Sequence, residues 1–463
     1  MTDPFTSKAD TKAFQLNMNR SVYGTFAEIG AGQEVARRFF AVGGASGTIA
    51  KTISAYDMAF SDAIYGACQR YVSRDRLRTM LDHEFALLVE RLDAKTGSER
   101  SFFVYANTVA ARSFRRHDES HGWMGLRFQK TPRSPLNEII IHVRMFDSEN
   151  LLQQEALGIV GVNLIYGAYY LGDQPEKLVA SLTEDLKPGR IGIDMIRFSG
   201  PEFASVDNRL MALRLVTDGL TQAALFRADG EVVNAADAFY KKPVLVERGS
   251  FRPVTLLTND MLDSALTAFV AEEKLESDPP EVLMEITMRN LIVDGSLDLR
   301  DFLDRVDVLS ALGRTVLISQ HAEFFRLVHY LRLYTDRPIG LPLGIPALVE
   351  IFDPQYYTEL EGGILEALGR LFKTGVSLYA YPWLNPQGHL VTAQDFDTHP
   401  AIRHLYAYLL EKRAIRPLEN SRPELLKIRS RDVLRLIREK NPEWKNMVPE
   451  LAARVIKERG LFA

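Results

Sequence analysis

The chain has 463 residues, of which 46% are apolar and 25% are charged, a composition typical of soluble globular proteins. This length exceeds one ordinary hydrophobic core, so two or three domains are expected. The 56 basic and 60 acidic side chains leave a net charge of −4, which argues against a dedicated nucleic-acid or anionic-membrane surface.

From the N-terminus, residues 1–20 are polar and predict a flexible arm. An apolar strand is expected at residues 24–30 and a helix at 33–42. Residues 73–93 have a strong helix pattern, because Ser73 is a good N-cap and an apolar stripe follows it. Strands without long helices between them then predict an antiparallel or mixed sheet, from residues 101–111, 122–129 and 138–146.

The longest apolar tract, residues 156–172, contains several glycines and predicts a buried helix rather than a membrane span. The first residues show no secretory signal. The single cysteine, Cys68, excludes an intrachain disulfide and a cysteine-rich metal centre, and no metal site is expected. We therefore predict a cytoplasmic protein without a membrane span.

The second half of the chain has a different pattern. The charged, proline-containing segment 271–281 predicts a domain boundary near residue 275. Strand and helix patterns alternate beyond it, which is typical of a parallel sheet wrapped by helices. The expected fold class is an α+β domain with a mixed sheet, an α/β domain with a mainly parallel sheet, and a basic helical tail, over residues 21–275, 276–420 and 421–463.

Residues 25–52 contain two glycine turns, each beside a predicted helix start, and resemble a phosphate-binding stretch. The dinucleotide fingerprint G-x-G-x-x-G is matched by Gly30 and Gly32, but Val35 stands in the third place. The P-loop pattern fails, because Gly47 lies too far before Lys51. The turn that begins at Glu28 also resembles that of S-adenosylmethionine-dependent methyltransferases, with Asp57 as a candidate partner for the ribose.

Two interpretations of these turns stay open. The glycines either expose backbone amides that hold an anion, with cations nearby, or permit tight turns and close helix packing. The later stretch 239–254 contains several cations around a predicted strand, which indicates either another anion contact or a charged edge strand. The candidate cofactor-binding residues are Glu28, Gly30, Gly32, Gly44, Gly47, Lys51, Asp57, Lys242 and Arg248.

Three residues are candidates for catalysis. His121 opens a predicted strand beside Trp123. Its four-residue spacing from His117 is the spacing that binds zinc on a helix, but the flanks are strands and a loop, so a polar loop is favoured over a metal site. Asp194 is an acid within an apolar strand, either a buried partner of an arginine or a site residue. His321 follows a predicted parallel strand, where α/β folds bind ligands, although a simple polar helix start is an equal interpretation.

Several long blocks resemble a bacterial protein family whose members often carry the label nicotinate-nucleotide adenylyltransferase. The blocks are residues 23–66, 121–129, 153–168, 206–216 and 241–253. The resemblance implies a nucleotide-dependent transferase. Adenylyltransferases of that class have an [HT]-x-G-H motif and an S-x-T-x-x-R segment, and neither occurs here, so the resemblance transfers no catalytic residue.

The function favoured by these patterns is binding of a nucleotide, such as ATP or NAD, or of another phosphorylated metabolite, with group transfer on that ligand as the expected chemistry. A second hypothesis is a self-assembling scaffold, a filament or a cage, without catalysis; a homo-oligomer is expected in either case. A third is a methyltransferase that uses S-adenosylmethionine.

Overall fold

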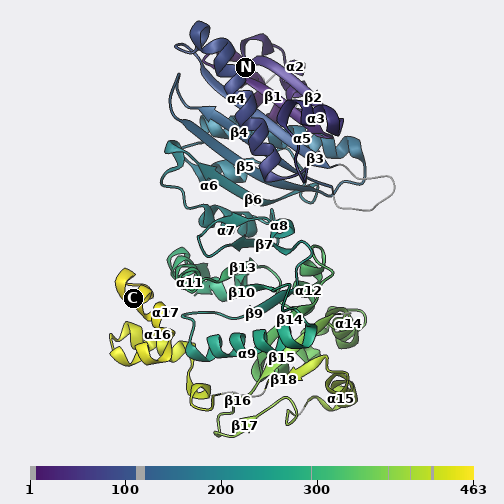
Figure 1. The fold of residues 1–463 in the computed structure, drawn as a ribbon, viewed down its shortest axis with the longest axis vertical. Helices are drawn as coiled ribbons and strands as arrows, with labels where there is room; N and C mark the ends of the chain where they lie inside the picture. The colour runs from purple at the N-terminus through teal and green to yellow at the C-terminus, as the bar shows by residue number, and fades with distance from the viewer. Residues whose placement is uncertain (1–6, 111–119, 294, 374, 397, 419–421) are drawn as a thin grey trace. The chain divides into compact units, whose positions relative to one another are not determined.

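The computed structural model describes residues 7–110, 120–293, 295–373, 375–396, 398–418 and 422–463. Contacts divide the chain into two compact units, Met1–Thr221 and Gln222–Ala463 (Figure 1). Each unit has its own sheet and its own hydrophobic core. The sequence-predicted division into an α+β part and an α/β part is seen in these two sheets.

The first unit is built on a six-stranded mixed sheet with the order β2-β1-β3-β4-β5-β6. β1 pairs in parallel with β2 and β3, and the remaining pairs are antiparallel. Its elements are α1 (Lys8–Met18), β1 (Val22–Gly30), α2 (Val35–Ala41), η1 (Ala45–Gly47), β2 (Ile49–Ala55), α3 (Met58–Tyr65), α4 (Arg74–Thr96), β3 (Ser101–Ala110), β4 (Ser120–Gln129), β5 (Leu136–Met145), α5 (Asn150–Tyr170), α6 (Pro175–Ser181), β6 (Ile191–Ser199), η2 (Pro201–Phe203) and α7 (Asn208–Thr217).

Helices cover both faces of this sheet. α1, α2, α5, α6 and α7 contribute to one core cluster with the strands. α4 packs on the opposite face, where its Leu77 and Leu81 lie against Gly125 of β4. The Ser73 hydroxyl caps α4 by accepting from the Arg76 amide at 3.1 Å, as the sequence predicts.

Two other predictions for this unit have clear outcomes. α5 is the predicted buried helix, and among the described residues no helix is long and apolar enough to cross a membrane. The prediction of a flexible arm is wrong for residues 8–18, because these residues form α1, in which Ala9, Ala13 and Leu16 are completely buried. Lys12 of α1 also donates to Asn163 and Glu184, both at 2.7 Å. Residues 1–6 lie outside the described range.

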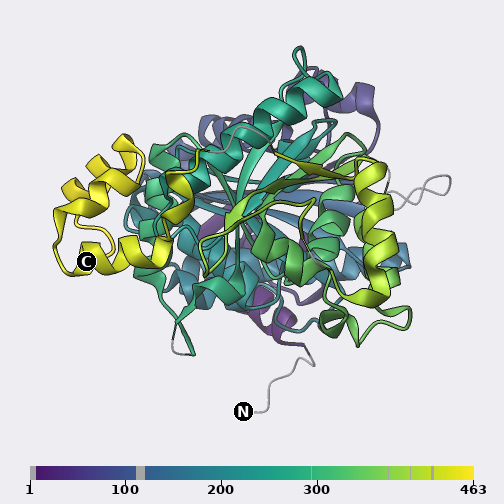
Figure 2. The same cartoon turned by 90° about the horizontal axis from the view of Figure 1, so that it is seen from below.

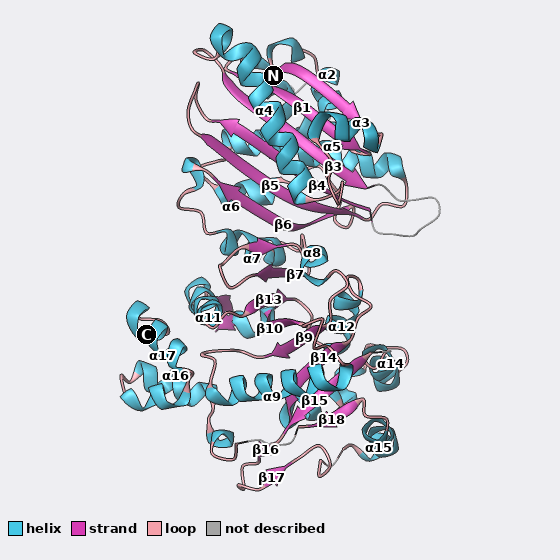
Figure 3. Ribbon diagram, viewed as in Figure 1, coloured by secondary structure: helices cyan, strands magenta, loops and turns pink. Residues whose placement is uncertain are grey.

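The second unit contains an eight-stranded sheet with the order β18-β15-β14-β9-β10-β13-β7-β8. The six strands from β18 to β13 are parallel, and β7 and β8 add an antiparallel edge. Its elements, coloured by type in Figure 3, are β7 (Ala223–Phe226), β8 (Val232–Val233), α8 (Ala235–Phe239), β9 (Val244–Arg248), α9 (Leu256–Glu273), β10 (Glu281–Thr287), α10 (Met288–Leu291), β11 (Ile292–Val293), β12 (Ser296–Leu297), α11 (Leu299–Ala311), β13 (Thr315–Ser319), α12 (Phe324–Arg332), β14 (Ile339–Gly344), α13 (Ile345–Ile351), η3 (Pro354–Tyr357), α14 (Gly363–Leu371), β15 (Val376–Tyr381), β16 (Trp383–Leu384), β17 (Leu390–Val391), η4 (Pro400–Ile402), α15 (Arg403–Glu411), β18 (Ile415–Pro417), η5 (Leu425–Lys427), α16 (Ser430–Arg438), η6 (Pro442–Met447) and α17 (Glu450–Arg459).

The chain path through the parallel strands changes direction once. It runs from β9 outward to β10 and β13, returns to β14 on the other side of β9, and continues to β15 and β18. This is the doubly wound order 3-2-1-4-5-6, in which ligands bind outside the carboxyl ends of the strands, where the order reverses. α9 covers one sheet face, where its Phe269 packs on Tyr379, while α12 to α15 join the core cluster on the other.

The division between the units lies at residues 221 and 222, earlier than the boundary predicted near residue 275. The physical reason is the position of β9, which pairs with β10 and β14 in the middle of the second sheet. Because β9 has a neighbour on each side, the charged edge strand predicted within residues 239–254 is wrong. The charged, proline-containing segment 271–281 comprises the end of α9, the connection that follows it and the first residue of β10, all within the second unit.

The predicted C-terminal tail is helical and belongs to the second unit. Figure 2 shows the yellow helices α16 and α17 together at one side of this unit. The Ser430 hydroxyl donates to the Pro253 carbonyl in the β9–α9 loop at 2.9 Å. At the end of the chain, the Phe462 amide donates to Asp304 of α11 at 2.6 Å. The first contact holds the start of α16 on the loop that follows β9, and the second holds the end of the chain on α11.

Candidate functional site

The first glycine turn has its helix-start amides occupied by a side chain of the same unit. The Glu28 carboxylate, near the end of β1, accepts from the amides of Val35 at 2.9 Å and Ala36 at 3.2 Å, where α2 begins. Asn107 donates to the same carboxylate at 3.4 Å. Glu28 is 2% exposed, and its carboxylate occupies the position in which a bound anion would accept hydrogen bonds from these amides. Burial raises its pKa to about 7, against the opposing effect of the two amide bonds.

Gly30 and Gly32 allow close backbone packing. Gly30 has a φ of +78°, and a Cβ there would lie 2.3 Å from the carbonyl oxygen of Val109. A Cβ at Gly32 would lie 2.5 Å from the Asn107 side chain, which donates to the Gly32 carbonyl at 2.9 Å. The packing interpretation of these glycines therefore has direct support.

The second glycine turn also closes on itself. The Gly47 amide donates to the Gly44 carbonyl at 3.2 Å. Lys51 forms an ion pair with the buried carboxylate of Glu84, and Asp57 caps α3 by accepting from the Phe60 amide at 2.9 Å. These contacts correct the expectation of open amides and uncommitted charges in residues 28–57.

The remaining cofactor-binding candidates lie in the second unit. Lys242 forms an exposed ion pair with Glu281 at 3.4 Å. Arg248, at the end of β9, donates to both oxygens of Glu285, at 2.5 and 3.1 Å. It also donates to the carbonyls of His321 at 2.8 Å and Ala322 at 2.6 Å. Arg248 therefore ties the loop after β13 to the ends of β9 and β10.

Glu285 is the centre of a buried polar cluster at this carboxyl edge. It is fully buried, and the Ser319 hydroxyl at the end of β13 donates to it at 2.5 Å. Because Arg248 balances the charge of Glu285, we expect the cluster to stabilise the ends of these strands. Sequence reasoning selected Arg248 and overlooked Glu285, although an acid within the apolar strand 282–287 was the available signal.

His321 lies after β13, at the predicted position. It is 7% exposed, packs on Tyr330 with ring centroids 5.1 Å apart, and has a buried Nε2 without a hydrogen-bond partner among the described residues. Burial, with the charges of Arg248 and Arg326 as further causes, lowers its pKa to about 4. The imidazole is therefore neutral at pH 7.

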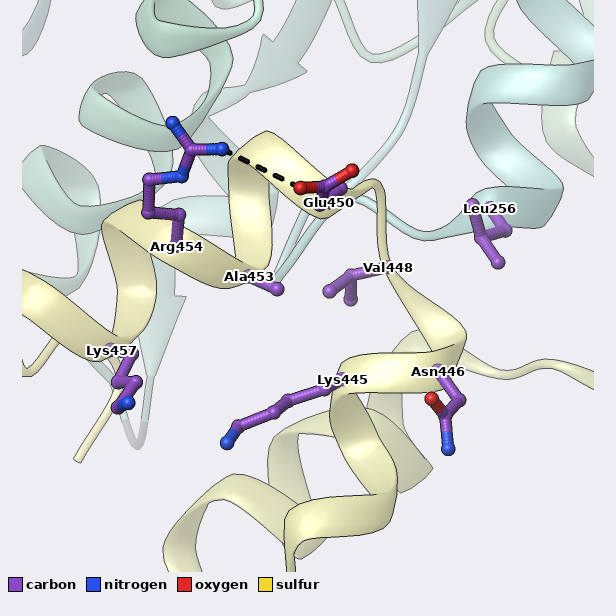
Figure 4. Close-up of a pocket in the computed structure, with 8 residues that line it drawn as sticks. All are labelled: Leu256, Lys445, Asn446, Val448, Glu450, Ala453, Arg454 and Lys457. Carbon is purple, nitrogen blue, oxygen red and sulfur yellow. Dashed lines mark hydrogen bonds and ion pairs between the residues drawn. The ribbon is translucent and has the colours of Figure 1, made fainter.

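An open groove of about 410 Å³ lies between the start of α9 and the C-terminal segments η6 and α17 (Figure 4). It is lined by Leu256, Lys445, Asn446, Val448, Glu450, Ala453, Arg454 and Lys457. Figure 4 shows the Lys445 side chain extending from η6 toward α17, which carries Lys457 and Arg454. Sequence reasoning noted the basic segment and gave no reason to select these cations.

The charges of the groove are unbalanced. Arg454 has a long contact of 3.5 Å to Glu450, whose side chain is 92% exposed. Lys445 and Lys457 have no carboxylate within ion-pair distance among the described residues. Three cations therefore face one acid around a surface that opens to solvent, an arrangement that favours an anionic ligand.

In the first unit, the catalytic candidates His121 and Asp194 are brought together by a third residue. His142 of β5 lies between them and contacts His121 at 3.0 Å and Asp194 at 2.6 Å. Sequence reasoning overlooked His142, whose signal was a histidine within the apolar strand 139–143. Among the described parts of the chain, no group of three or more His, Cys, Asp or Glu side chains has the arrangement of a metal site. His117 lies outside them.

Comparisons with known proteins add little to this geometry. No family model matches the sequence. A search of curated proteins gives no match. Among solved structures, the chain is similar to the competence/damage inducible protein CihA from Agrobacterium tumefaciens, with 14% identity and a TM-score of 0.25, over 39% of this chain and 99% of that one. A CinA superfamily protein from Enterobacter cloacae has 10% identity and a TM-score of 0.24, over 36% and 93%. TM-scores this low support no conclusion about fold or function.

Proposed function

We propose that the second unit binds a nucleotide or another phosphorylated metabolite in the groove beside α9. The observation that carries the proposal is the set of three cations, Lys445, Arg454 and Lys457, around one open groove with a single exposed acid. Phosphate groups carry the compact negative charge that such a set attracts.

The place of the groove in the fold supports the same ligand class. Leu256 is the first residue of α9, the helix that follows β9, and the strand order reverses between β9 and β14. In doubly wound sheets, ligands bind outside this edge, and the positive end of a helix dipole favours anions. Because the groove is open, we expect the binding energy to come mainly from charge and therefore to fall with added salt.

Calorimetry on the full chain tests the proposal, with ATP, NAD, nicotinate mononucleotide and S-adenosylmethionine as ligands. We expect the phosphorylated ligands to bind, and to bind about tenfold more weakly after Lys445→Ala with Lys457→Ala, since each lost contact costs about 0.5–1 kcal/mol. Lys427→Ala removes an exposed lysine elsewhere in the same unit and is the matched control.

Two results would overturn the proposal. One is the absence of binding by all three phosphorylated ligands. The other is binding that the double lysine variant leaves unchanged. Binding of S-adenosylmethionine alone would instead favour the methyltransferase hypothesis. To test group transfer, the chain is incubated with each nucleotide that binds and the products are analysed. His321→Asn is the first variant for this assay, because His321 is a neutral imidazole at the same edge of the sheet.

A second candidate, self-association, has support from one surface of the first unit. Tyr56, Met58 and Phe60 are 81%, 61% and 58% exposed beside β2, the edge strand of the sheet. Adjacent exposed apolar side chains are typical of surfaces that contact another protein molecule. Light scattering on the intact chain tests this candidate: we expect an oligomer that Phe60→Asp dissociates, and a monomer at all concentrations would exclude it.

A further inference from the structure

A second groove of the second unit, of about 510 Å³, lies between the β16–β17 hairpin and the start of α16, and we call it the hairpin groove. It is lined by Trp383, Pro386, Arg429, Ser430 and Arg431. It shares none of these residues with the groove beside α9. An indole ring and two guanidinium groups therefore border one cavity, and its described lining includes no carboxylate.

The indole of Trp383 is a fixed apolar surface. Trp383 is the first residue of β16 and is partly buried against the core cluster of the second unit. Its cross-strand partner, Val391 of β17, packs on the same cluster. Because the core holds one part of the indole in place, the part that stays exposed is a rigid surface on which a flat ring can stack.

The turn of the hairpin is held by one side chain. Oδ1 of Asn385 accepts from the amides of Gln387 at 3.0 Å and His389 at 2.8 Å, and the Asn385 amide donates to the His389 carbonyl at 3.0 Å. Pro386 lies inside this closed turn, and its ring restricts the backbone further. The hairpin wall is therefore formed before a ligand arrives, which lowers the entropy cost of binding.

The opposite wall carries the two arginines. Arg429 is half-buried, and its Nη2 donates to the Leu384 carbonyl of the hairpin at 3.1 Å, which orients the guanidinium and leaves further N–H donors. Arg431 is exposed. Between them, the Ser430 hydroxyl donates to the Pro253 carbonyl at 2.9 Å and fixes the backbone. Among the described residues, neither arginine has a carboxylate within ion-pair distance, so both charges are open to a ligand.

We propose that the hairpin groove binds a small aromatic anion, a flat ring that carries a carboxylate or a phosphate group. The ring stacks on Trp383, and the anionic group accepts hydrogen bonds from Arg429 and Arg431, whose planar guanidinium groups match both oxyanions. The volume of the groove is within the range of sites for small ligands. This site is separate from the groove beside α9, and the proposal does not depend on the function proposed for that groove.

Calorimetry on the full chain tests the proposal with 2-naphthoate and 2-naphthyl phosphate, which combine a flat ring with an anionic group. Inorganic phosphate lacks the ring, and 2-naphthalenemethanol lacks the charge. We expect at least one naphthyl anion to bind, and to bind at least about tenfold more tightly than either of these two control probes, because only a naphthyl anion makes both kinds of contact. The naphthyl anion that binds more tightly identifies the anionic group that the site prefers.

Two variants place the probe in the groove. Trp383→Leu and Arg431→Gln should each weaken binding about tenfold, and the exposed position of Arg431 makes loss of folding an unlikely cause in the second variant. Arg438→Gln, which replaces an exposed arginine at the other end of α16, is the matched control and should leave binding unchanged.

Four results would overturn the proposal. The first is the absence of binding by both naphthyl anions. The second is equally tight binding of inorganic phosphate or 2-naphthalenemethanol. The third is binding that either Trp383→Leu or Arg431→Gln leaves unchanged. The fourth is binding that is weakened by Lys445→Ala with Lys457→Ala as much as by Arg431→Gln, because the probe would then occupy the groove beside α9.

Discussion

The glycine turn after β1 and the carboxyl edge around β9 present the same ingredients and use them differently. Each has a glycine after a parallel strand, a helix start and a buried glutamate. In the first unit Glu28 points its carboxylate at the α2 amides, so the chain supplies its own anion. In the second unit Glu285 is neutralised by Arg248, and three cations lie around the groove beside α9 with Glu450 as the one acid among its described lining residues.

The comparison teaches that an anion site depends on where the chain places its own carboxylates. Glycines and helix starts supply donors in both regions. In the second region Glu285 is already paired with Arg248, and positive charge remains for a ligand at the groove beside α9. Two buried groups, Glu28 in the first unit and His321 in the second, are expected to contribute to the pH dependence of stability with opposite signs.

The largest expected effect is that of Gly30→Ala. The substitution requires a left-handed backbone for alanine and places Cβ 2.3 Å from the Val109 carbonyl oxygen. We expect a loss of about 4 kcal/mol in the free energy of unfolding, measured by urea denaturation. Gly43→Ala is the matched control, because Gly43 has a φ of +81° and nothing within 4 Å of its Cβ position. It should cost only about 1 kcal/mol; equal losses would show that the close approach to β3 is unimportant.

Glu28→Gln tests the pH dependence of the first unit. Burial raises the pKa of Glu28 to about 7 from 4.5, so the folded chain binds this proton more tightly than the unfolded chain. The stability it contributes is complete below pH 4.5 and is lost as the pH rises through 7, by about 3 kcal/mol. Hydrogen exchange of β1 and α2 amides should show this loss in the wild type and not in Glu28→Gln. Parallel pH profiles for the two proteins would contradict the prediction.

His321→Asn tests the opposite dependence in the second unit. The pKa of His321 is lowered to about 4 from 6.5, so protonation favours the unfolded chain. The stability that neutral His321 contributes is complete above pH 6.5. It is lost as the pH falls through 4, and the free energy of unfolding then decreases by about 3 kcal/mol. Hydrogen exchange of β10 and β13 amides between pH 7 and 4 measures the loss. The prediction fails if the asparagine variant loses as much stability on acidification as the wild type.

The smallest effect concerns the buried cluster itself. Ser319→Ala removes the hydroxyl that donates to Glu285 and should cost about 2 kcal/mol, because a buried carboxylate loses a hydrogen bond. Ser310→Ala is the control, since the Ser310 hydroxyl is buried without a hydrogen-bond partner among the described residues. Thermal denaturation should leave that variant as stable as the wild type or more so. A similar loss in both variants would argue against a special role for the cluster.

Local patterns in the sequence determined much of the architecture. The Ser73 cap and apolar stripe of α4, the antiparallel strands β3 to β5 and the strand–helix alternation after residue 281 were all predictable, because each depends on neighbours close in the chain. α1 was overlooked because its apolar face consists largely of the small residues Ala9 and Ala13.

The candidate sites were predictable only in part. His121, Asp194, Arg248 and His321 were selected from single-residue signals, and the structure shows their partners, His142 and Glu285 among them, on other strands. The occupation of the α2 amides by Glu28 and the convergence of Lys445 and Lys457 beside α9 likewise arise from tertiary structure alone. Hydrophobic periodicity is a property of adjacent residues, whereas the balance of charge at a point in space depends on segments that only folding brings together.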